Sequence, residues 1–253
     1  MYRDLGVRPG KLHTTGMMKF DTAQVGRHVP GQEALALAMG IEPGEGLLVA
    51  GGTGDGEEAV CLDVLAAVRT SCPAARLAIV PRKPERFGEV ARLIASRGLS
   101  LARRSEHGDG AAAPAGRPDV LLGDTMGELR KFYALAAAVF VGRSLVPMGG
   151  SDMIESAALG KPTAFGPHTF NFPQAEQLAA HGCSRVADAE TLARQFAAWL
   201  TDPPAAAKAA AEAQDYVRGQ MGSTRRNVDM ICRVLGRVPA EADGQIATDE
   251  IAE

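Results

Sequence analysis

The chain has 253 residues, of which 46% are hydrophobic, with a formal net charge of −3 and a pI near 6.0. These values are typical of a globular protein with one large or two modest cores, and they argue against a surface built for nucleic acid. The longest apolar runs, such as Ala134 to Val141, are far shorter than the ~20 residues that span a bilayer, so no membrane-crossing segment is expected.

The cysteines indicate a reduced environment. Cys61, Cys72, Cys183 and Cys232 lie far apart, without the spacing of a metal site, and no charged-then-apolar leader precedes them. We therefore expect buried free thiols in a cytoplasmic protein.

In chain order, short apolar runs typical of buried strands alternate with amphipathic segments. Strands are expected at residues 46–52, 76–82, 99–103, 119–124, 137–142, 162–166 and 184–188. A helix with an apolar stripe follows the first strand, another is expected from about Pro84 to Arg97, and later helices start near Met126, Asp152, Phe172 and Ala189. This alternation predicts the α/β class, with a Rossmann-like parallel sheet covered by helices on both faces.

The two ends differ from the middle. Residues 4–21 are expected to contain one strand but no complete βαβ unit, so residues 1–35 should end an interdomain connection, whereas residues 36–238 should form the main domain. Val228, Ile231, Cys232 and Leu235 recur at helical spacing, which predicts a C-terminal helix whose apolar face promotes self-association. The acidic residues 239–253 are expected to be disordered.

Ligands of open parallel sheets bind beyond the carboxyl ends of the strands, so the loops after the strands are the candidate sites. The first, "GGTGDGEE", offers bare backbone amides to an anion, or is a tight turn capped by Asp55 and Glu58. Arg82 and Lys83 follow the next strand, where they would hold a phosphate or form a solvated basic turn.

Two later loops leave similar alternatives open. In "GDTMGEL", Asp124 or Thr125 would cap a helix with Glu128 completing the box, or Gly127 would let a ligand approach. After the apolar run at 137–142, Gly149 and Gly150 precede a helix with Glu155 in its first turn. That glutamate would accept hydrogen bonds from sugar hydroxyls or close its own cap.

Taken together, the segments resemble the 3-deoxy-D-manno-octulosonic acid (Kdo) transferases of lipopolysaccharide assembly, from about Leu5 to Val238. The resemblance is carried, in order, by "TGMMKFD", "VAGGTGDGEE", "IVPRKPERF", "LLGDTMGEL", "VFVGRSLVPMGGSDMIESAALGKP" and "FGPHTFNF". It implies the C-terminal, CMP-sugar-binding half of a two-domain glycosyltransferase-B architecture.

The resemblance also implies residue roles. The helix start after Gly149 and Gly150, together with Arg82, would bind the donor phosphate, and Glu155 would bind the ribose. The turn Met126, Gly127 and Glu128 would line the cytosine pocket. Residues 166–168 would face the sugar, although His168 is equally well read as a packed loop histidine. The full expected donor-binding set is Gly52, Thr53, Arg82, Met126, Gly127, Glu128, Gly149, Gly150, Ser151, Asp152, Glu155 and His168.

The sequence also departs from the family pattern. The family usually has Ser-Thr-His at residues 52–54, His-Asn at residues 151 and 152, and Asn where Met17 stands. A carboxylate at Asp152 is unfavourable beside a phosphate. Two alternatives therefore stay open: a domain of the same fold for another sugar nucleotide, such as a UDP-sugar transferase or an epimerase, and a degenerate, non-catalytic nucleotide-binding module.

In the family, a separate acceptor-side domain supplies the general base, the contacts to lipid A and the membrane anchor. The chain is therefore expected to bind CMP or CMP-Kdo without a catalytic residue of its own, a metal or another cofactor, and to be inactive alone. In a complete enzyme at the cytoplasmic face of the inner membrane, a lipid A precursor hydroxyl would displace CMP at the anomeric carbon.

Overall fold

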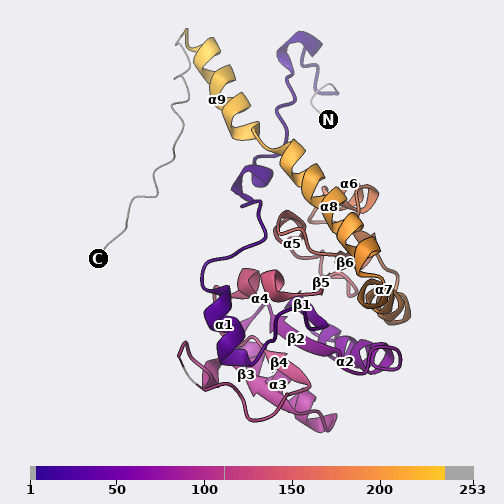
Figure 1. The fold of residues 1–253 in the computed structure, drawn as a ribbon. Coiled ribbons are helices and arrows are strands. Elements are labelled where there is room, and N and C mark those ends of the chain that lie inside the picture. The colour runs from indigo at the N-terminus through magenta and orange to yellow at the C-terminus, as the bar shows by residue number, and fades with distance from the viewer. Residues whose placement is uncertain (1–3, 111, 237–253) are drawn as a thin grey trace. The chain divides into compact units, whose positions relative to one another are not determined.

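The computed structural model describes residues 4–110 and 112–236 (Figure 1). They fall into two compact units, one of residues 23–219 and a smaller one made of the segments before Ala23 and after Gly219. The domain boundary expected at residues 35 and 36 falls inside helix α1 (Gln32–Met39), which packs on helix α4 of the larger unit. The expected disordered tail, 239–253, lies outside the described residues.

One sheet of seven parallel strands forms the centre of the larger unit, in the order β3-β4-β2-β1-β5-β6-β7. Its strands are β1 (Leu47–Thr53), β2 (Arg76–Pro81), β3 (Leu101–Arg103), β4 (Val120–Leu122), β5 (Ala138–Val141), β6 (Thr163–Phe165) and β7 (Ser184–Arg185). These seven strands match the seven segments expected between residues 46 and 188, and the predicted α/β fold is confirmed. The strand expected within residues 4–21 is wrong: this stretch, which glycines and a proline interrupt, contains the 3-10 turns η1 (Pro9–Lys11) and η2 (Met18–Thr22) and no strand.

Helices cover both faces of this sheet, which explains why β1 and β2 are buried along their whole length (Figure 1). Leu48 and Ala50 of β1 belong to a core shared with α2 (Glu57–Val68), α3 (Phe87–Ser96) and α7 (Ala189–Thr201). On the other face, α4 (Leu129–Leu135) packs against β1, α1 and α5 (Ile154–Ala158). Helices α6 (Ala175–Ala180) and α8 (Pro203–Gln220) follow β6 and α7.

Several helices begin later than expected. The helix expected from Pro84 starts with the 3-10 turn η3 (Pro84–Arg86), and α4, α5 and α6 start two or three residues after the expected positions. The residues before α4 form a turn in which Gly127 has a φ of 82°, a conformation that cannot continue an α-helix. Helix α7 starts at Ala189 as expected, because Asp188 and Thr191 form a capping box.

The smaller unit contains η1 (Pro9–Lys11), η2 (Met18–Thr22) and α9 (Ser223–Val234). The Asp21 carboxylate accepts hydrogen bonds from the backbone N–H groups of Gly222 and Thr224, both at 2.5 Å, at the start of α9. The predicted C-terminal helix is therefore confirmed, and Val228 and Ile231 are exposed on it.

The four cysteines are free, but only Cys61 and Cys183 are buried, while Cys72 and Cys232 are half-buried. The expectation of buried thiols is thus correct for two of them. Burial raises the pKa of the Cys183 thiol to about 12.

None of the helices in residues 4–110 and 112–236 combines the length and the apolar character that crossing a bilayer requires.

Candidate functional site

The chain reverses its direction of winding at β1, with β2 on one side of this strand and β5 on the other. The loops after β1 and β5 therefore diverge at the carboxyl edge of the sheet, where open α/β sheets bind ligands. The Ser151 hydroxyl donates a hydrogen bond to the Gly52 carbonyl at 3.1 Å and joins the loop after β5 to the end of β1. Gly52 has a φ of 65°, and a Cβ there would lie 2.9 Å from Oγ of Ser151, so both strain and contact favour glycine.

Glu57 is the buried group that holds the two loops in place. Its Oε1 accepts the backbone N–H groups of Ser144 at 2.8 Å and Leu145 at 2.9 Å. Its Oε2 accepts those of Gly54 at 2.9 Å and of Arg143. The sequence predicted that the backbone N–H groups after β1 are free to bind an anion. One of them, that of Gly54, is instead bonded to the Glu57 carboxylate.

Gly149 and Gly150 connect the loop after β5 to the loop after β6. They have φ values of 87° and 88°, and a Cβ on Gly149 would lie 2.0 Å from Nδ2 of Asn171. The Gly150 N–H donates to the Arg143 carbonyl at 2.7 Å, and the Gly149 carbonyl accepts from the Asn171 N–H at 3.2 Å. The Gly150 amide is therefore already bonded within the protein, and these glycines set the close approach of two loops.

Asp152 and His168 flank the same loops. The Asp152 carboxylate accepts the Ile154 N–H at 3.0 Å, at the start of α5. Met153 is the N-cap residue of α5 and makes no side-chain cap hydrogen bond, so the Asp152 carboxylate is the group that bonds the first helical amide. His168 is half-buried, and its backbone N–H donates to the Ser144 carbonyl at 2.9 Å.

Arg82 follows β2 and is exposed, and its backbone N–H donates to the Thr53 carbonyl at 3.1 Å. Its guanidinium makes no hydrogen bond or ion pair with any residue that the structure describes, so it is open to an anion. The Thr53 side chain is buried instead, and its hydroxyl donates to Glu58 at 2.8 Å.

The capping box suggested for Asp55 and Glu58 is wrong. Gly56 occupies the N-cap of α2 without a side-chain cap. Both carboxylates bind Arg86, with Oδ1 of Asp55 at 3.2 Å and Oε1 of Glu58 at 2.6 Å from its guanidinium nitrogens. The ion pairs of Asp55 and Glu58 with the mostly buried guanidinium of Arg86 are stronger than the hydrogen bonds of a local capping box would be.

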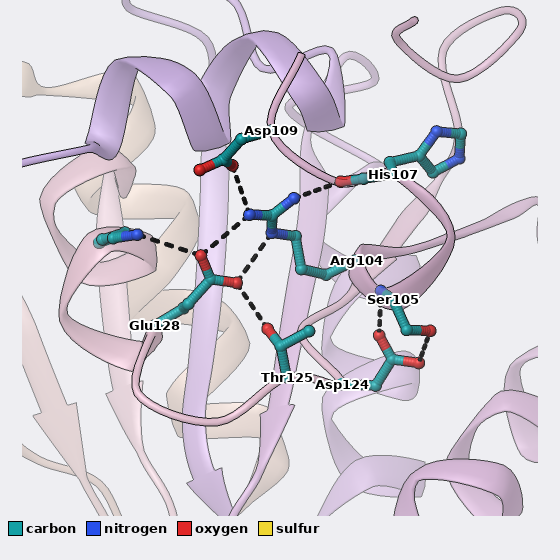
Figure 2. A network of polar contacts seen from close by, with 8 residues as sticks. Arg104, Ser105, His107, Asp109, Asp124, Thr125 and Glu128 are labelled. Carbon is teal, nitrogen blue, oxygen red and sulfur yellow. Dashed lines mark hydrogen bonds and ion pairs between the residues drawn. The ribbon is translucent and has the colours of Figure 1, made fainter. Parts of the chain in front are cut away.

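The turn 126–128 after β4 is held by a charged network (Figure 2). The Glu128 carboxylate accepts hydrogen bonds from Nε and Nη2 of the buried Arg104, at 2.8 and 3.0 Å. It also accepts a hydrogen bond from the Thr125 hydroxyl at 2.5 Å. Burial opposes ionisation of Glu128, but the hydrogen bonds from Arg104, Thr125 and Lys131 outweigh it and lower its pKa from 4.5 to about 2. The Glu128 carboxylate is thus committed to the fold.

The capping box suggested for Asp124 or Thr125 with Glu128 is likewise wrong, because Glu128 itself is the N-cap of α4 and no side chain caps it. Asp124 instead accepts the backbone N–H and the hydroxyl of Ser105 at 2.8 and 2.6 Å (Figure 2). Met126 is 68% exposed, and Gly127 has no neighbour within 4 Å of a built Cβ. Met126 and Gly127 are therefore the open part of this turn, and β2 separates their strand from β1.

The sequence reasoning did not single out Tyr133, which lies beneath the site. Its hydroxyl is buried without a hydrogen-bond partner among the described residues, and its ring packs against Gly51. Burial raises the pKa of this phenol, the carboxylates of Glu155 and Asp152 raise it further, and Arg82 lowers it. The charges of Arg82, Asp152 and Glu155 thus act on the ionisation of one buried hydroxyl.

Glu57, Arg104 and Tyr133 were missed because their roles depend on residues far away in the chain. The only local signal was the pair of adjacent carboxylates, Glu57 and Glu58, in "GDGEE". The capping interpretation assigned Glu58 a role and gave Glu57 none. Across the described ranges, no group of three or more His, Cys, Asp or Glu side chains is placed to hold a metal ion.

Comparison with known proteins relates the chain to one family. No protein-family model matches the chain. The 3-deoxy-D-manno-octulosonic acid transferase of Bordetella pertussis is 36% identical over 228 residues, which are 88% of this chain and 51% of that protein. The Haemophilus influenzae transferase is 30% identical over 239 residues, 93% of this chain and 55% of that protein. The chain thus spans about half the length of these curated relatives.

Solved structures agree. The C-terminal CMP-Kdo binding domain of WaaA from Acinetobacter baumannii superposes with a TM-score of 0.64 and 31% identity, covering 73% of this chain and 95% of that one. WaaG, a glycosyltransferase involved in lipopolysaccharide biosynthesis, shares the fold with a TM-score of 0.53 at 16% identity, covering 81% of this chain and 52% of that one. The chain belongs to the 3-deoxy-D-manno-octulosonic acid transferase family and has the fold of the C-terminal domain of a glycosyltransferase-B enzyme.

Proposed function

We propose that the chain is the donor-binding domain of a Kdo transferase and binds CMP-Kdo at the carboxyl edge of its sheet. The observation that carries this proposal is the 31% identity to a CMP-Kdo binding domain of which the chain covers 95%. The loops after β1 and β5 support it, because they diverge at the point of the sheet where open α/β folds bind ligands, in the crevice outside the strand ends.

Within that crevice, the open guanidinium of Arg82 binds the donor phosphate, and Glu155 accepts hydrogen bonds from the ribose hydroxyls. Met126 and Gly127 face the cytosine, while Glu128 only shapes their turn because Arg104 occupies its carboxylate. Gly52, Gly149 and Gly150 allow the close backbone approach, Ser151 and Asp152 line it, and His168 lies on the sugar side. Thr53 supports the crevice from within the core.

In the full-length enzyme, a hydroxyl of the lipid A precursor attacks the anomeric carbon of Kdo and CMP leaves. Arg82 stabilises the negative charge that develops on the leaving phosphate. The general base and the acceptor contacts come from the other half of the enzyme, at the cytoplasmic face of the inner membrane, so this chain alone does not transfer Kdo.

Calorimetric titration of the chain with CMP, CMP-Kdo and UDP tests the proposal. We expect CMP and CMP-Kdo to bind more tightly than UDP, and Arg82→Gln to weaken CMP binding about tenfold or more, as for a lost hydrogen bond to a charged group. Arg92→Gln, on the exposed side of α3, is the matched control and should not change the affinity.

Two results contradict the proposal. Tighter binding of UDP than of CMP would show a domain for another sugar nucleotide. Binding of no nucleotide at millimolar concentration would show a degenerate module. Incubation of the chain with CMP-Kdo and a lipid A precursor should give no transferred sugar, and product formation would disprove the dependence on the other half.

A further inference from the structure

Arg143, directly after β5, has a backbone conformation that normally belongs to glycine. Its φ is 58°, and among the described residues it is the one non-glycine residue with a positive φ. Its N–H donates to the Glu57 carboxylate and its carbonyl accepts the Gly150 N–H at 2.7 Å, so both sides of the residue are held in this conformation. An arginine here stores backbone strain that a glycine would not have, and such strain is concentrated at functional sites.

The Arg143 side chain lies between the loops of the candidate site. A Cβ built on Gly54 would lie 3.1 Å from Cγ of Arg143 and 2.5 Å from Sδ of Met148, so these two side chains occupy the space above Gly54. The Cγ atom of Arg143 therefore lies close to Gly54, two residues after Gly52, and the Arg143 carbonyl accepts the N–H of Gly150. Gly52 and Gly150 both belong to the residues proposed to approach the donor.

The guanidinium of Arg143 has few partners. Its Nε is buried without a hydrogen bond, and Nη2 lies 3.4 Å from the Met148 carbonyl, which is a long contact. No carboxylate pairs with it in the part of the chain that the structure describes. By contrast, the buried Arg104 binds Glu128 and Asp109, and Arg76 binds Glu45. A half-buried arginine without a counter-ion is suited to an anion that comes from outside.

Resting on the proposed function, we propose that Arg143 binds the carboxylate of the donor's sugar acid. A CMP-activated sugar acid carries two anionic groups, a phosphate diester and a carboxylate, and Arg82 serves the first of them. The planar guanidinium of Arg143 matches a carboxylate with two parallel hydrogen bonds. Arg143 is thereby a specificity residue that distinguishes an acidic sugar from a neutral one.

The test uses the whole chain with Arg143→Gly, Arg143→Gln and Arg143→Lys, and measures the melting temperature and the affinities for CMP and CMP-Kdo. Arg143→Gly should raise the melting temperature, because glycine adopts this φ without strain. In both neutral variants the affinity for CMP-Kdo should fall about 10- to 100-fold while that for CMP changes less than about twofold. Arg143→Lys should show an intermediate loss, because lysine keeps the charge without the fork.

Arg194→Gln, which removes an exposed arginine of α7, is the control for a general charge effect and should change neither affinity. Equal losses for CMP and CMP-Kdo would place Arg143 at the phosphate and overturn the assignment. Unchanged CMP-Kdo affinity in Arg143→Gly and Arg143→Gln would overturn it as well. If the unmodified chain binds neither compound, the proposed function itself fails, and the role of Arg143 fails with it.

Discussion

The hydroxyl of Tyr133 lies directly beneath Gly51, so close that a Cβ on Gly51 would be 2.3 Å from the oxygen and 2.4 Å from the ring carbon Cε1. The glycine in the middle of a buried strand is therefore required by the aromatic ring of α4, which packs against β1. This contact sets the distance between the sheet and the helix just below the candidate site.

Gly51→Ala should destabilise the protein by about 1–3 kcal/mol, because the inserted methyl group overlaps a ring that is buried and cannot move away. Denaturant unfolding measures the change. Gly88→Ala, in α3, is the matched control, since no atom lies within 4 Å of its built Cβ. It should leave the stability equal or raise it by about 0.5–1 kcal/mol through helix propensity. Equal effects of the two substitutions would contradict the packing role of Gly51.

Glu57→Gln should cost about 2–4 kcal/mol of stability, because the amide has one acceptor oxygen for the four backbone N–H groups that the carboxylate now binds. We also expect weaker CMP binding, because the loops after β1 and β5 lose their common support. Glu190→Gln, on the exposed side of α7, provides the comparison and should be nearly neutral. A melting temperature for Glu57→Gln close to that of the unmodified protein would rule out this role.

Glu155→Gln should weaken CMP binding by roughly 1.5–3 kcal/mol with little change in thermal stability, as expected for a lost hydrogen bond between a charged group and the ribose. Glu155→Ala should behave similarly, because Asp152 and not Glu155 bonds the first amide of α5. Calorimetric titration and melting of both variants check this. CMP affinity that is unaltered in both would end the ribose assignment, and a large loss of stability would indicate a structural role.

The Glu128 network should make the protein sensitive to acid. Because the folded-state pKa of Glu128 is lowered from 4.5 to about 2, its ionised form stabilises the fold above pH 4.5, and this contribution is lost as the pH falls from 4.5 towards 2. The contribution is of order 2–3 kcal/mol. Glu128→Gln should therefore lower the stability at pH 7 and flatten its decline between pH 4.5 and 2. An unchanged slope in unfolding measurements over this range would contradict the assignment.

Helix α9 should promote self-association, because Ile231 and Val234 are 58% and 81% exposed on it. We expect Ile231→Lys to shift the protein towards monomer in sedimentation experiments at high concentration. Ala211→Lys adds the same charge at an exposed position of α8 and should leave the association unchanged. A chain that is already monomeric at the highest concentration would show that this face does not mediate association.

The sequence alone was sufficient to predict the sheet, the alternation of strands and helices, and the loops that form the candidate site. Runs such as "LLVAGG" and "VFVG" identify buried parallel strands because a segment covered on both faces must be apolar throughout, and this property is local to a few residues. Gly54, Gly56, Gly149 and Gly150 marked the loops after β1 and β5, because glycine is the residue that adopts the tight turns of such loops, which is also a local property.

Only the tertiary structure decided which partner each charged side chain takes. Glu58 and Glu128 were read as local caps, yet they bind Arg86 and Arg104, and Glu57 collects amides from a loop that lies more than 80 residues further along the chain. A cap needs only the first turn of its own helix, so its pattern can be recognised in a short window. A buried carboxylate binds whatever donors the neighbouring strands bring to the sheet edge, and strand order is a property of the whole fold. The left-handed conformation of Arg143 has the same origin, because its backbone is held by Glu57, at the start of α2, and by Gly150, at the far end of its own loop.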